Sequence, residues 1–292
     1  MSNRDLCFRS ATELSVRIRS GALSARELME AHLEQIEVVQ PKVNAFVTVA
    51  AESALAQAEA ADNLFAARRT ERASLPPLHG MPIAVKDLIR TRGIRTTFGS
   101  TLYADFVPDA DDLLAERYRA AGAIVIGKTN TPEFGCGGGQ TTNAVCGDTR
   151  NPYDLTRACG SSSGGAAVAL AARLAPLADG SDFGGSLRHP AGHCNVVGFR
   201  PTPGRVPAFP AELGWFTLRT DGPMGRTVAD TALLLSVQAG PDPRSPIALP
   251  EPGEAFAGSL QRDFAGARVA FSPDLGFLPV DSRVRDIFER QR

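Results

Sequence analysis

The sequence predicts an α/β protein in which helices cover a buried sheet. Short apolar runs such as residues 123–128 are typical of strands that are covered on both faces. These runs alternate with longer segments whose apolar residues recur at helical spacing, and this alternation favours a layered α/β architecture. With 292 residues and 43% hydrophobic content, the chain can bury one large core or two smaller ones.

Residues 1–72 are predicted to form an N-terminal helical layer or arm. Ser10 and Ser24 are each followed three positions later by glutamate, which is the capping-box pattern at the start of a helix. The second of these helices should end before Pro41, and an alanine-rich helix should follow over residues 50–67. No strand is expected among these helices. The arm is expected to cover the core or to grip a partner subunit, as in a homodimer.

Residues 73–292 are predicted to form the α/β core, and a Leu-Pro-Pro segment at residues 75–77 marks its beginning. Helical and extended patterns alternate through this part of the chain. In chain order we expect a strand over 81–89, a helix over 111–121, a strand over 123–128, a long functional or mobile loop over 128–152, a buried helix over 166–172, a strand or turn over 195–199, an edge strand or substrate-facing loop over 214–218, a helix over 227–239, a buried strand over 268–272 and an amphipathic helix from 284 onward.

Composition argues against several classes of function. A formal net charge of -1 gives no electrostatic case for binding nucleic acid or an anionic membrane. The longest apolar run, residues 166–178, is interrupted by Arg173 and is too short to cross a bilayer. The N-terminus lacks the pattern of a signal peptide. The five cysteines are widely spaced and form neither a disulfide framework nor a zinc motif, so a reducing cytoplasm is the simplest expectation.

Two glycine–serine clusters, residues 160–165 and 179–190, flank the predicted buried helix. Glycine lets the backbone turn sharply and expose several N–H groups at once. Such a loop can hold a nucleophilic hydroxyl beside hydrogen-bond donors, as acyl transfer requires. Clusters of this composition are more often turns or linkers, but a flexible linker would not enclose an apolar helix. The stretch is therefore a candidate active site.

A histidine-based site is the first alternative for this stretch. A Ser-His-Asp triad could combine His189 or His193 with Asp179 or Asp182. Residues 160–164 also match the Gly-x-Ser-x-Gly elbow of α/β-hydrolases, although a loop rather than a strand precedes them. A phosphate-binding loop is disfavoured because the required lysine is absent.

A metal site is a weaker alternative. His189 and His193 have helical spacing, but Pro190 and Gly192 work against a regular helix between them. His32 lies on an amphipathic helix and is expected to be solvated. No metal ion or other cofactor is therefore expected.

Lys86 is the remaining candidate base. Only three of the 31 basic side chains are lysine, and Lys86 lies in an apolar stretch. Burial disfavours the ammonium form, so its pKa can fall from about 10.4 towards neutrality and leave an amine that accepts a proton. The residues alone leave a second interpretation open, in which Lys86 pairs with Asp87 or another carboxylate.

Several long motifs of the chain resemble those of the amidase signature family. The similar segments are residues 80–87, 128–135, 160–165, 182–190 and 222–227. The resemblance extends from about residue 8 to residue 240, and its motifs are specific. It implies a mixed central sheet covered by helices on both faces, and hydrolysis of a carboxamide to a carboxylate and ammonia or an amine.

The resemblance also implies a Ser–cis-Ser–Lys triad. Position by position, the family's lysine falls on Lys86, its bridging serine on Ser162 and its nucleophile on Ser186. The family usually has Gly, Ala or Val before the bridging serine, where this chain has Ser161. We predict that the Ser161–Ser162 peptide bond is cis.

The same comparison places the groups that would support this triad. Asp182 and Arg188 match the family's supporting polar pair. The implied donors of the oxyanion hole are the backbone N–H groups of Phe183, Gly184, Gly185 and Ser186.

Members of the family usually have C-terminal strands that complete the sheet and one wall of the pocket. Residues 73–292 are expected to lack that part. The leading interpretation is an amidase acting on a small linear, non-peptide amide. Two alternatives stay open: the A-type glutaminase subunit of a tRNA-dependent amidotransferase, and a non-catalytic homologue. Specificity should lie in residues 136–150 and 207–216, where Trp215 and Phe216 line an acyl pocket or fill a surface cleft.

Overall fold

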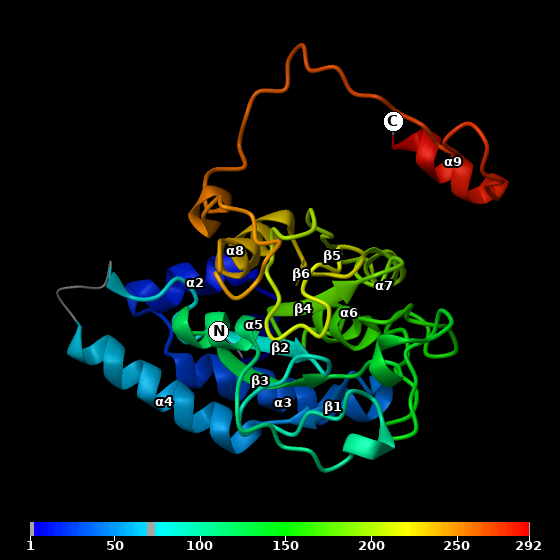
Figure 1. The fold of residues 1–292 in the computed structure, drawn as a ribbon. Coiled ribbons are helices and arrows are strands. Elements are labelled where there is room, and N and C mark those ends of the chain that lie inside the picture. Colours follow the sequence, from blue (N-terminus) through cyan, green and yellow to red (C-terminus); the bar gives the residue numbers. More distant parts are fainter. Residues whose placement is uncertain (1–2, 69–73, 292) are drawn as a thin grey trace. The chain divides into compact units, whose positions relative to one another are not determined.

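The computed structural model describes residues 3–68 and 74–291, and it divides into two compact units, Met1–Gly258 and Ser259–Arg292. The first unit is a sheet with helices on both faces (Figure 1). Its helices are α1 (Asn3–Cys7), α2 (Ala11–Ser20), α3 (Ala25–Val43), α4 (Ala51–Ala67), α5 (Leu113–Ala120), α6 (Gly164–Ala171), α7 (Arg188–Cys194) and α8 (Val228–Gln238). Short 3₁₀ turns lie at Thr101–Tyr103, Glu133–Gly135 and Gly253–Phe256.

Six strands among the described residues form one sheet, in the order β1-β3-β2-β4-β6-β5. They are β1 (Phe46–Val49), β2 (Pro82–Lys86), β3 (Ile124–Thr129), β4 (Leu177–Asp182), β5 (Val197–Gly198) and β6 (Thr220–Gly225). The central strand β2 is parallel to β3 and to β4, while the outer pairs are antiparallel. The predicted α/β fold with a mixed sheet is confirmed.

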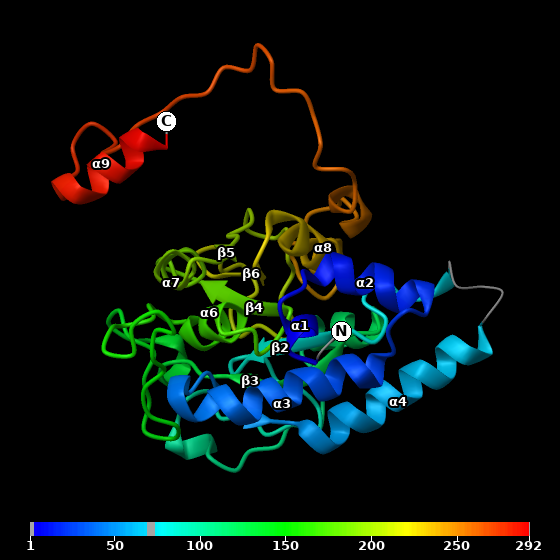
Figure 2. The ribbon, with the colours of Figure 1, turned by 180° about the vertical axis from the view of Figure 1, so that it is seen from behind.

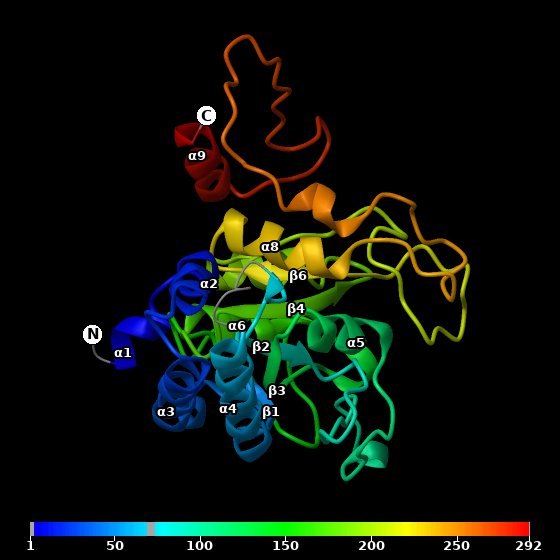
Figure 3. The same cartoon turned by 90° about the vertical axis from the view of Figure 1, so that its left-hand side faces the viewer.

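Alternating strand residues build two apolar cores, one on each face of the sheet. On β2, Ile83 and Val85 pack into the core formed with α2, α5 and α8, whereas Ala84 packs into the core formed with α3, α4 and α6. Figure 3 shows α8 and α2 on one side of the sheet and α3 and α4 on the other, and Figure 2 shows α3 and α4 from behind. The sheet is thus covered on both faces, as its apolar strands require.

The N-terminal helices differ from prediction in two respects. Both capping boxes form, at Ser10 and Ser24. However, α3 continues through Pro41 to Val43 and ends at Asn44, which has a φ of 51°. The missed strand β1 follows directly and pairs with β3. Pro41 lacks the N–H that would bond the carbonyl of Glu37, and the helix ends within one turn after it.

The expectation that His32 is solvated is wrong. Its side chain is fully buried on α3, and burial lowers the pKa of the imidazole to about 3. The backbone of the segment after α6, at Arg173 and Leu174, lies against the His32 ring. A polar residue on an amphipathic helix is solvated only if no other segment packs on that face.

The second unit contains one helix, α9 (Ser282–Arg290), among its described residues. The predicted amphipathic helix is therefore confirmed. The predicted strand at residues 268–272 is wrong, because Val269 and Phe271 lie in an exposed irregular segment. No other strand within described residues 259–291 is available to pair with it, and an unpaired strand leaves its backbone groups unsatisfied. No helix in the described part of the chain is long and apolar enough to cross a membrane.

The start of α6 packs against backbone so closely that it requires glycine at Gly165. A Cβ there would lie 2.7 Å from the carbonyl oxygen of Ala45, and nearer still to backbone atoms of Asn130. We expect Gly165→Ala to lower the free energy of unfolding by about 3 kcal/mol, since backbone cannot move aside as a side chain can. Urea denaturation followed by circular dichroism measures this change.

The matched control is Gly138→Ala, because a Cβ at Gly138 meets nothing within 4 Å. This variant should stay close to the wild-type stability. Equal losses in the two variants would contradict the close packing of α6.

Candidate active site

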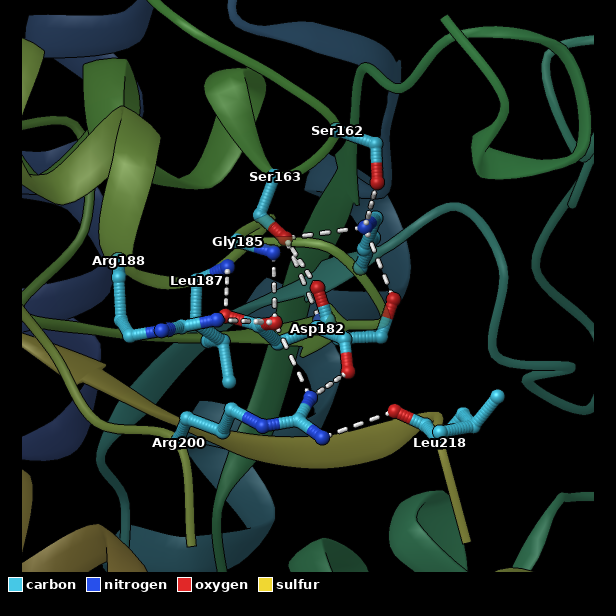
Figure 4. A network of polar contacts seen from close by, with 10 residues as sticks. Ser162, Ser163, Asp182, Gly185, Leu187, Arg188, Arg200 and Leu218 are labelled. Atoms are coloured by element: carbon cyan, nitrogen blue, oxygen red, sulfur yellow. Dashed lines mark hydrogen bonds and ion pairs between the residues drawn. The ribbon is translucent and has the colours of Figure 1, made fainter. Parts of the chain in front are cut away.

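Lys86 ends β2, and its side chain is buried between the two glycine–serine clusters. Its Nζ lies 2.8 Å from Ser162 Oγ, 2.9 Å from Ser163 Oγ and 3.0 Å from Ser181 Oγ (Figure 4). Two of these serines precede α6, and the third lies on β4. Hydroxyl groups from both clusters therefore surround the amine.

Burial lowers the pKa of Lys86 to about 7. The positive charge of Arg219 lowers this pKa further, whereas Asp221, Asp179 and Asp182 raise it. A neutral amine has two N–H donors and one lone pair, so at least one of the three hydroxyls must donate to Nζ. The site can therefore hold a hydroxyl whose hydrogen points at a free amine.

The competing interpretation, an ion pair between Lys86 and Asp87, is not observed. Asp87 Oδ2 instead accepts hydrogen bonds from the backbone N–H of Thr97 at 2.9 Å and from its hydroxyl at 2.5 Å. Within the part of the chain that the structure describes, no carboxylate oxygen lies within 4.0 Å of the Lys86 amine. Lys86 is thus available as a base.

The Ser161–Ser162 peptide bond is cis, as predicted. Gly160 precedes it with a φ of 79°, and a Cβ at Gly160 would lie 2.7 Å from the Cα of Pro190. Glycine thus lets the first cluster turn and pack directly against the second. On the other side of the cluster, a Cβ at Gly135 would lie 3.6 Å from Ser162 Oγ.

Asp182 ends β4 and holds the loop that follows through its buried carboxylate (Figure 4). The backbone N–H groups of Gly185 and Leu187 donate to it at 2.8 and 3.1 Å. Arg188 donates at 3.0 and 3.2 Å, and Arg200 at 3.0 Å. Burial by itself would raise the pKa of Asp182, but these hydrogen bonds outweigh it and lower the pKa to about 2. Asp182 and Arg188, the expected supporting pair, therefore lie in contact.

This loop leaves three of the four expected oxyanion donors without an acceptor. The N–H of Gly185 is donated to Asp182, which corrects the expectation that it faces a substrate. Over the described residues, the N–H groups of Phe183, Gly184 and Ser186 have no intramolecular acceptor. Gly185 has a φ of 117°, a conformation that glycine permits, and so the turn can direct its neighbours outward.

Ser186 lies half-buried at the end of the same loop. Its carbonyl accepts the N–H of Ser163 at 3.3 Å, which ties the two clusters together. The Ser186 hydroxyl has no hydrogen-bond partner within 3.5 Å among the described residues. The structure thus joins Lys86 to Ser162 directly and holds Ser186 in the adjoining loop.

The histidine alternatives gain no support. Arg188–Cys194 is helical, contrary to expectation, because Pro190 lies in the first turn, where N–H groups have no helical partner. The rings of His189 and His193 pack against each other with centroids 4.4 Å apart. No hydrogen bond among the described residues joins either ring to a serine of the site. No group of three metal-ligating side chains was found in the same part of the chain.

A cavity of about 710 Å³ adjoins the site, and most of its wall is apolar. Six aromatic side chains line it: Phe98, Tyr103, Phe106, Phe134, Phe209 and Phe216. Phe216 also stacks on Phe183 of the loop that follows β4, with ring centroids 6.0 Å apart. Leu88, another lining residue, reaches the Gly135 backbone beside Ser162. Of the two segments expected to carry specificity, residues 208–214 and Phe216 line this cavity, whereas residues 136–150 do not. Trp215 does not line it either and is 77% exposed.

Sequence reasoning missed three polar residues around the site, Ser163, Ser181 and Arg200, and considered Asp179 only as the partner of a histidine. Ser163 and Ser181 bind the Lys86 amine, and their position within the two glycine–serine clusters was a usable signal. Arg200 donates to Asp182 and to the Leu218 carbonyl, at 2.9 Å for the latter. Nothing in the local sequence indicates its partner.

Comparisons with known proteins identify the family of this chain. The sequence matches the Amidase family over residues 27–292. An acylamidase of Rhodococcus erythropolis is 39% identical over 284 residues, which are 97% of this chain and 58% of the relative. The A-type subunit of the glutamyl-tRNA(Gln) amidotransferase of Thioalkalivibrio sulfidiphilus is 42% identical over 261 residues, 89% of this chain and 53% of the relative. The solved structure of a bacterial aryl acylamidase, an amidase signature enzyme, is 31% identical with a TM-score of 0.84 and covers 97% of this chain and 58% of its own.

The chain spans a little more than half the length of these relatives. The family match nevertheless includes the sheet, the buried lysine and both serine clusters. The chain therefore belongs to the Amidase family, the amidase signature enzymes.

Proposed function

We propose that this chain carries the active site of an amide hydrolase that works through an acyl-enzyme. Ser186 is the nucleophile, Ser162 the bridging hydroxyl and neutral Lys86 the base. The observation that supports this most is the 2.8 Å contact between the buried Lys86 amine and Ser162 Oγ. A desolvated amine in contact with a hydroxyl, rather than with a carboxylate, is suited to accept a proton.

The first half of the reaction forms the acyl-enzyme. Lys86 takes the proton of Ser162, Ser162 takes that of Ser186, and Ser186 Oγ attacks the amide carbon. The N–H groups of Phe183, Gly184 and Ser186 stabilise the oxyanion, each by about 2.7–4 kcal/mol if they act as other such donors do. The Lys86 ammonium then returns its proton through Ser162 to the substrate nitrogen. The C–N bond breaks, and ammonia or an amine leaves.

The second half of the reaction hydrolyses the acyl-enzyme, and the same proton relay activates the water molecule. A water molecule loses its proton through the same two groups and attacks the acyl ester, releasing the carboxylate and the Ser186 hydroxyl. Direct contact between the Ser162 and Ser186 hydroxyls is needed in both halves. Catalytic hydrogen bonds are often long before substrate binds, and the partly exposed Ser186 hydroxyl can turn when the acyl group is seated.

The aromatic cavity supports a linear amide with an apolar acyl group as the substrate. We expect kcat/KM for primary amides to rise about fourfold per added methylene from acetamide to hexanamide, because each buried methylene is worth about 0.8 kcal/mol. Ammonia release in steady state measures the series. Phe216→Ala should reduce the rise of kcat/KM with chain length and leave kcat/KM for acetamide unchanged. Trp215→Ala alters an exposed ring and should leave kcat/KM for every amide of the series unchanged. A flat wild-type series would contradict this assignment.

The second candidate is the glutaminase subunit of a tRNA-dependent amidotransferase. The 42% identity to such a subunit favours it. A glutaminase would prefer glutamine to hexanamide and would copurify with other subunits of its complex. The aromatic side chains of the cavity support the first candidate, whereas its charged lining residues, Arg90, Asp112, Glu212, Arg219 and Asp221, suit a polar substrate such as glutamine. The two amides compared side by side decide between the candidates.

Location and assembly are part of the same proposal. All five cysteines are free thiols, which supports a reducing compartment such as the cytoplasm. A homodimer is proposed on the N-terminal helices alone, and sedimentation velocity tests it.

A further inference from the structure

Strands β2 and β4 separate just before the active-site lysine. They pair in parallel at Ile83↔Leu177 and Ala84↔Ala178, and their pairing ends there. The backbone N–H of Lys86 is instead donated to the side chain of Asp179, with 2.6 Å between N and Oδ1. A carboxylate on β4 thus replaces the carbonyl that a continued ladder would supply.

The other oxygen of this carboxylate is held from two helices. Tyr118 on α5 donates its hydroxyl to Asp179 Oδ2 at 2.9 Å. Gln238 on α8 donates to the Tyr118 oxygen at 2.7 Å. All three side chains are buried, so this chain of hydrogen bonds fixes the position of Asp179. Burial raises the pKa of Asp179 to about 6, and its two donors act against that rise, so the group is largely ionised above neutral pH.

We propose that Asp179, held by Tyr118 and Gln238, is a positioning residue that fixes the main chain of Lys86 and supplies a negative charge near its amine. This inference rests on the proposed role of Lys86 as a base. It deepens that role, because it names what holds the base in place at the point where the sheet opens.

The charges around Lys86 and Asp179 determine in which direction the pKa of Lys86 should change when Asp179 is replaced. Lys86 faces Arg219 and Asp221 from β6 and the segment before it, and Asp179 and Asp182 from β4. Asp179 in turn faces Lys128 on β3 and Asp221 on β6. The negative charge of Asp179 raises the pKa of Lys86. Asp179→Asn removes that charge, so the pKa of Lys86 should fall.

The experiment titrates the lysines directly by NMR. The chain has only Lys42, Lys86 and Lys128, so protein labelled with ¹³C at the lysine ε-carbon gives few signals, and loss of one signal in Lys86→Arg assigns it. In Asp179→Asn the Lys86 midpoint should move down by about half a pH unit or more. The acid limb of kcat/KM should move with it.

A matched control is Asp230→Asn on α8. Asp230 is also buried and accepts a backbone N–H, from Thr12 at 3.0 Å, but it has no contact with Lys86 among the described residues. Its loss should lower stability and leave the Lys86 midpoint in place. If Asp179→Asn does not fold, Tyr118→Phe takes over the test: it removes one donor from Asp179, raises the pKa of that carboxyl and should lower the Lys86 midpoint by a smaller amount.

The outcomes separate this inference from the proposed function. An unchanged Lys86 midpoint in Asp179→Asn, or in Tyr118→Phe where that variant replaces it, overturns the inference, even if the wild type hydrolyses amides. A midpoint that shifts as expected supports it, even if no amide is hydrolysed, in which case the proposed function fails alone.

Discussion

Ser186→Ala should lose about 10⁶-fold in kcat, as serine hydrolases do when the nucleophile is removed. Without the Ser186 oxygen no acyl-enzyme forms. Neither Ser162 nor Lys86 can replace it as the nucleophile, since both side chains are buried and bonded to each other. Steady-state ammonia release from the best amide of the graded series measures the loss. A fluorophosphonate probe should label the wild type at Ser186 and leave the variant unlabelled.

The variant should fold like the wild type, because the Ser186 hydroxyl has no hydrogen-bond partner among the described residues. Its backbone carbonyl, which holds Ser163, is unaffected by the substitution. Ser236→Ala is the matched control: it removes a serine hydroxyl on α8 whose one partner among the described residues is the Leu233 carbonyl of the same helix. Wild-type turnover by Ser186→Ala would show that another group attacks the substrate.

The parts of the site that lie within continuous motifs were predictable from sequence. An apolar strand buries its side chains, so the burial of Lys86 follows from the pattern of β2. Its lowered pKa also depends on the absence of a paired carboxylate, which the residues alone left open. The buried helix α6 follows from an alanine-rich run without a polar face. The cis bond at Ser162 was implied only by the resemblance to a family, since no property of two adjacent serines requires it.

Two central strands escaped prediction because their residues are typical of turns. Leu177–Asp182 and Thr220–Gly225 contain glycine, aspartate and proline, yet all of their residues are buried and pair with one another along their whole length. Glycine is required in them by close packing: a Cβ at Gly180 would lie 2.6 Å from Ser163 Oγ. Tertiary contacts thus override local propensity at the centre of this sheet.

The remaining errors concern partners that are distant in the sequence. His32 is buried by a segment around Arg173, well over a hundred positions away, so its own helix gives no indication of its burial. Asp179 was considered only as the partner of a histidine. Its actual partners, Tyr118 and Gln238, lie on two other helices. Such contacts depend on how layers pack, which a single sequence does not reveal.

Lys86→Met should lower kcat by about 10²–10⁴-fold, the range that a general base contributes. Methionine has similar length and fills the buried space, but it cannot accept a proton from Ser162. In the wild type, kcat/KM should fall as the pH drops through about 7, the pKa to which burial lowers Lys86, because the ammonium form has no lone pair. Residual activity of the variant should lack this acid limb. A full pH–rate profile of both proteins measures the effect.

Lys128 is the group from which this titration must be separated, because burial lowers its pKa to about 8. Its Nζ donates to Thr91 Oγ1 at 2.8 Å and to the Ile89 carbonyl, and to no serine of the site among the described residues. Lys128→Met should therefore keep the acid limb, although its midpoint can move because Lys128 also faces Asp179. A limb that disappears in Lys128→Met, or that persists in Lys86→Met, would assign the titration to another group. Since only a neutral amine can start the relay, the acid limb must belong to the lysine that contacts Ser162.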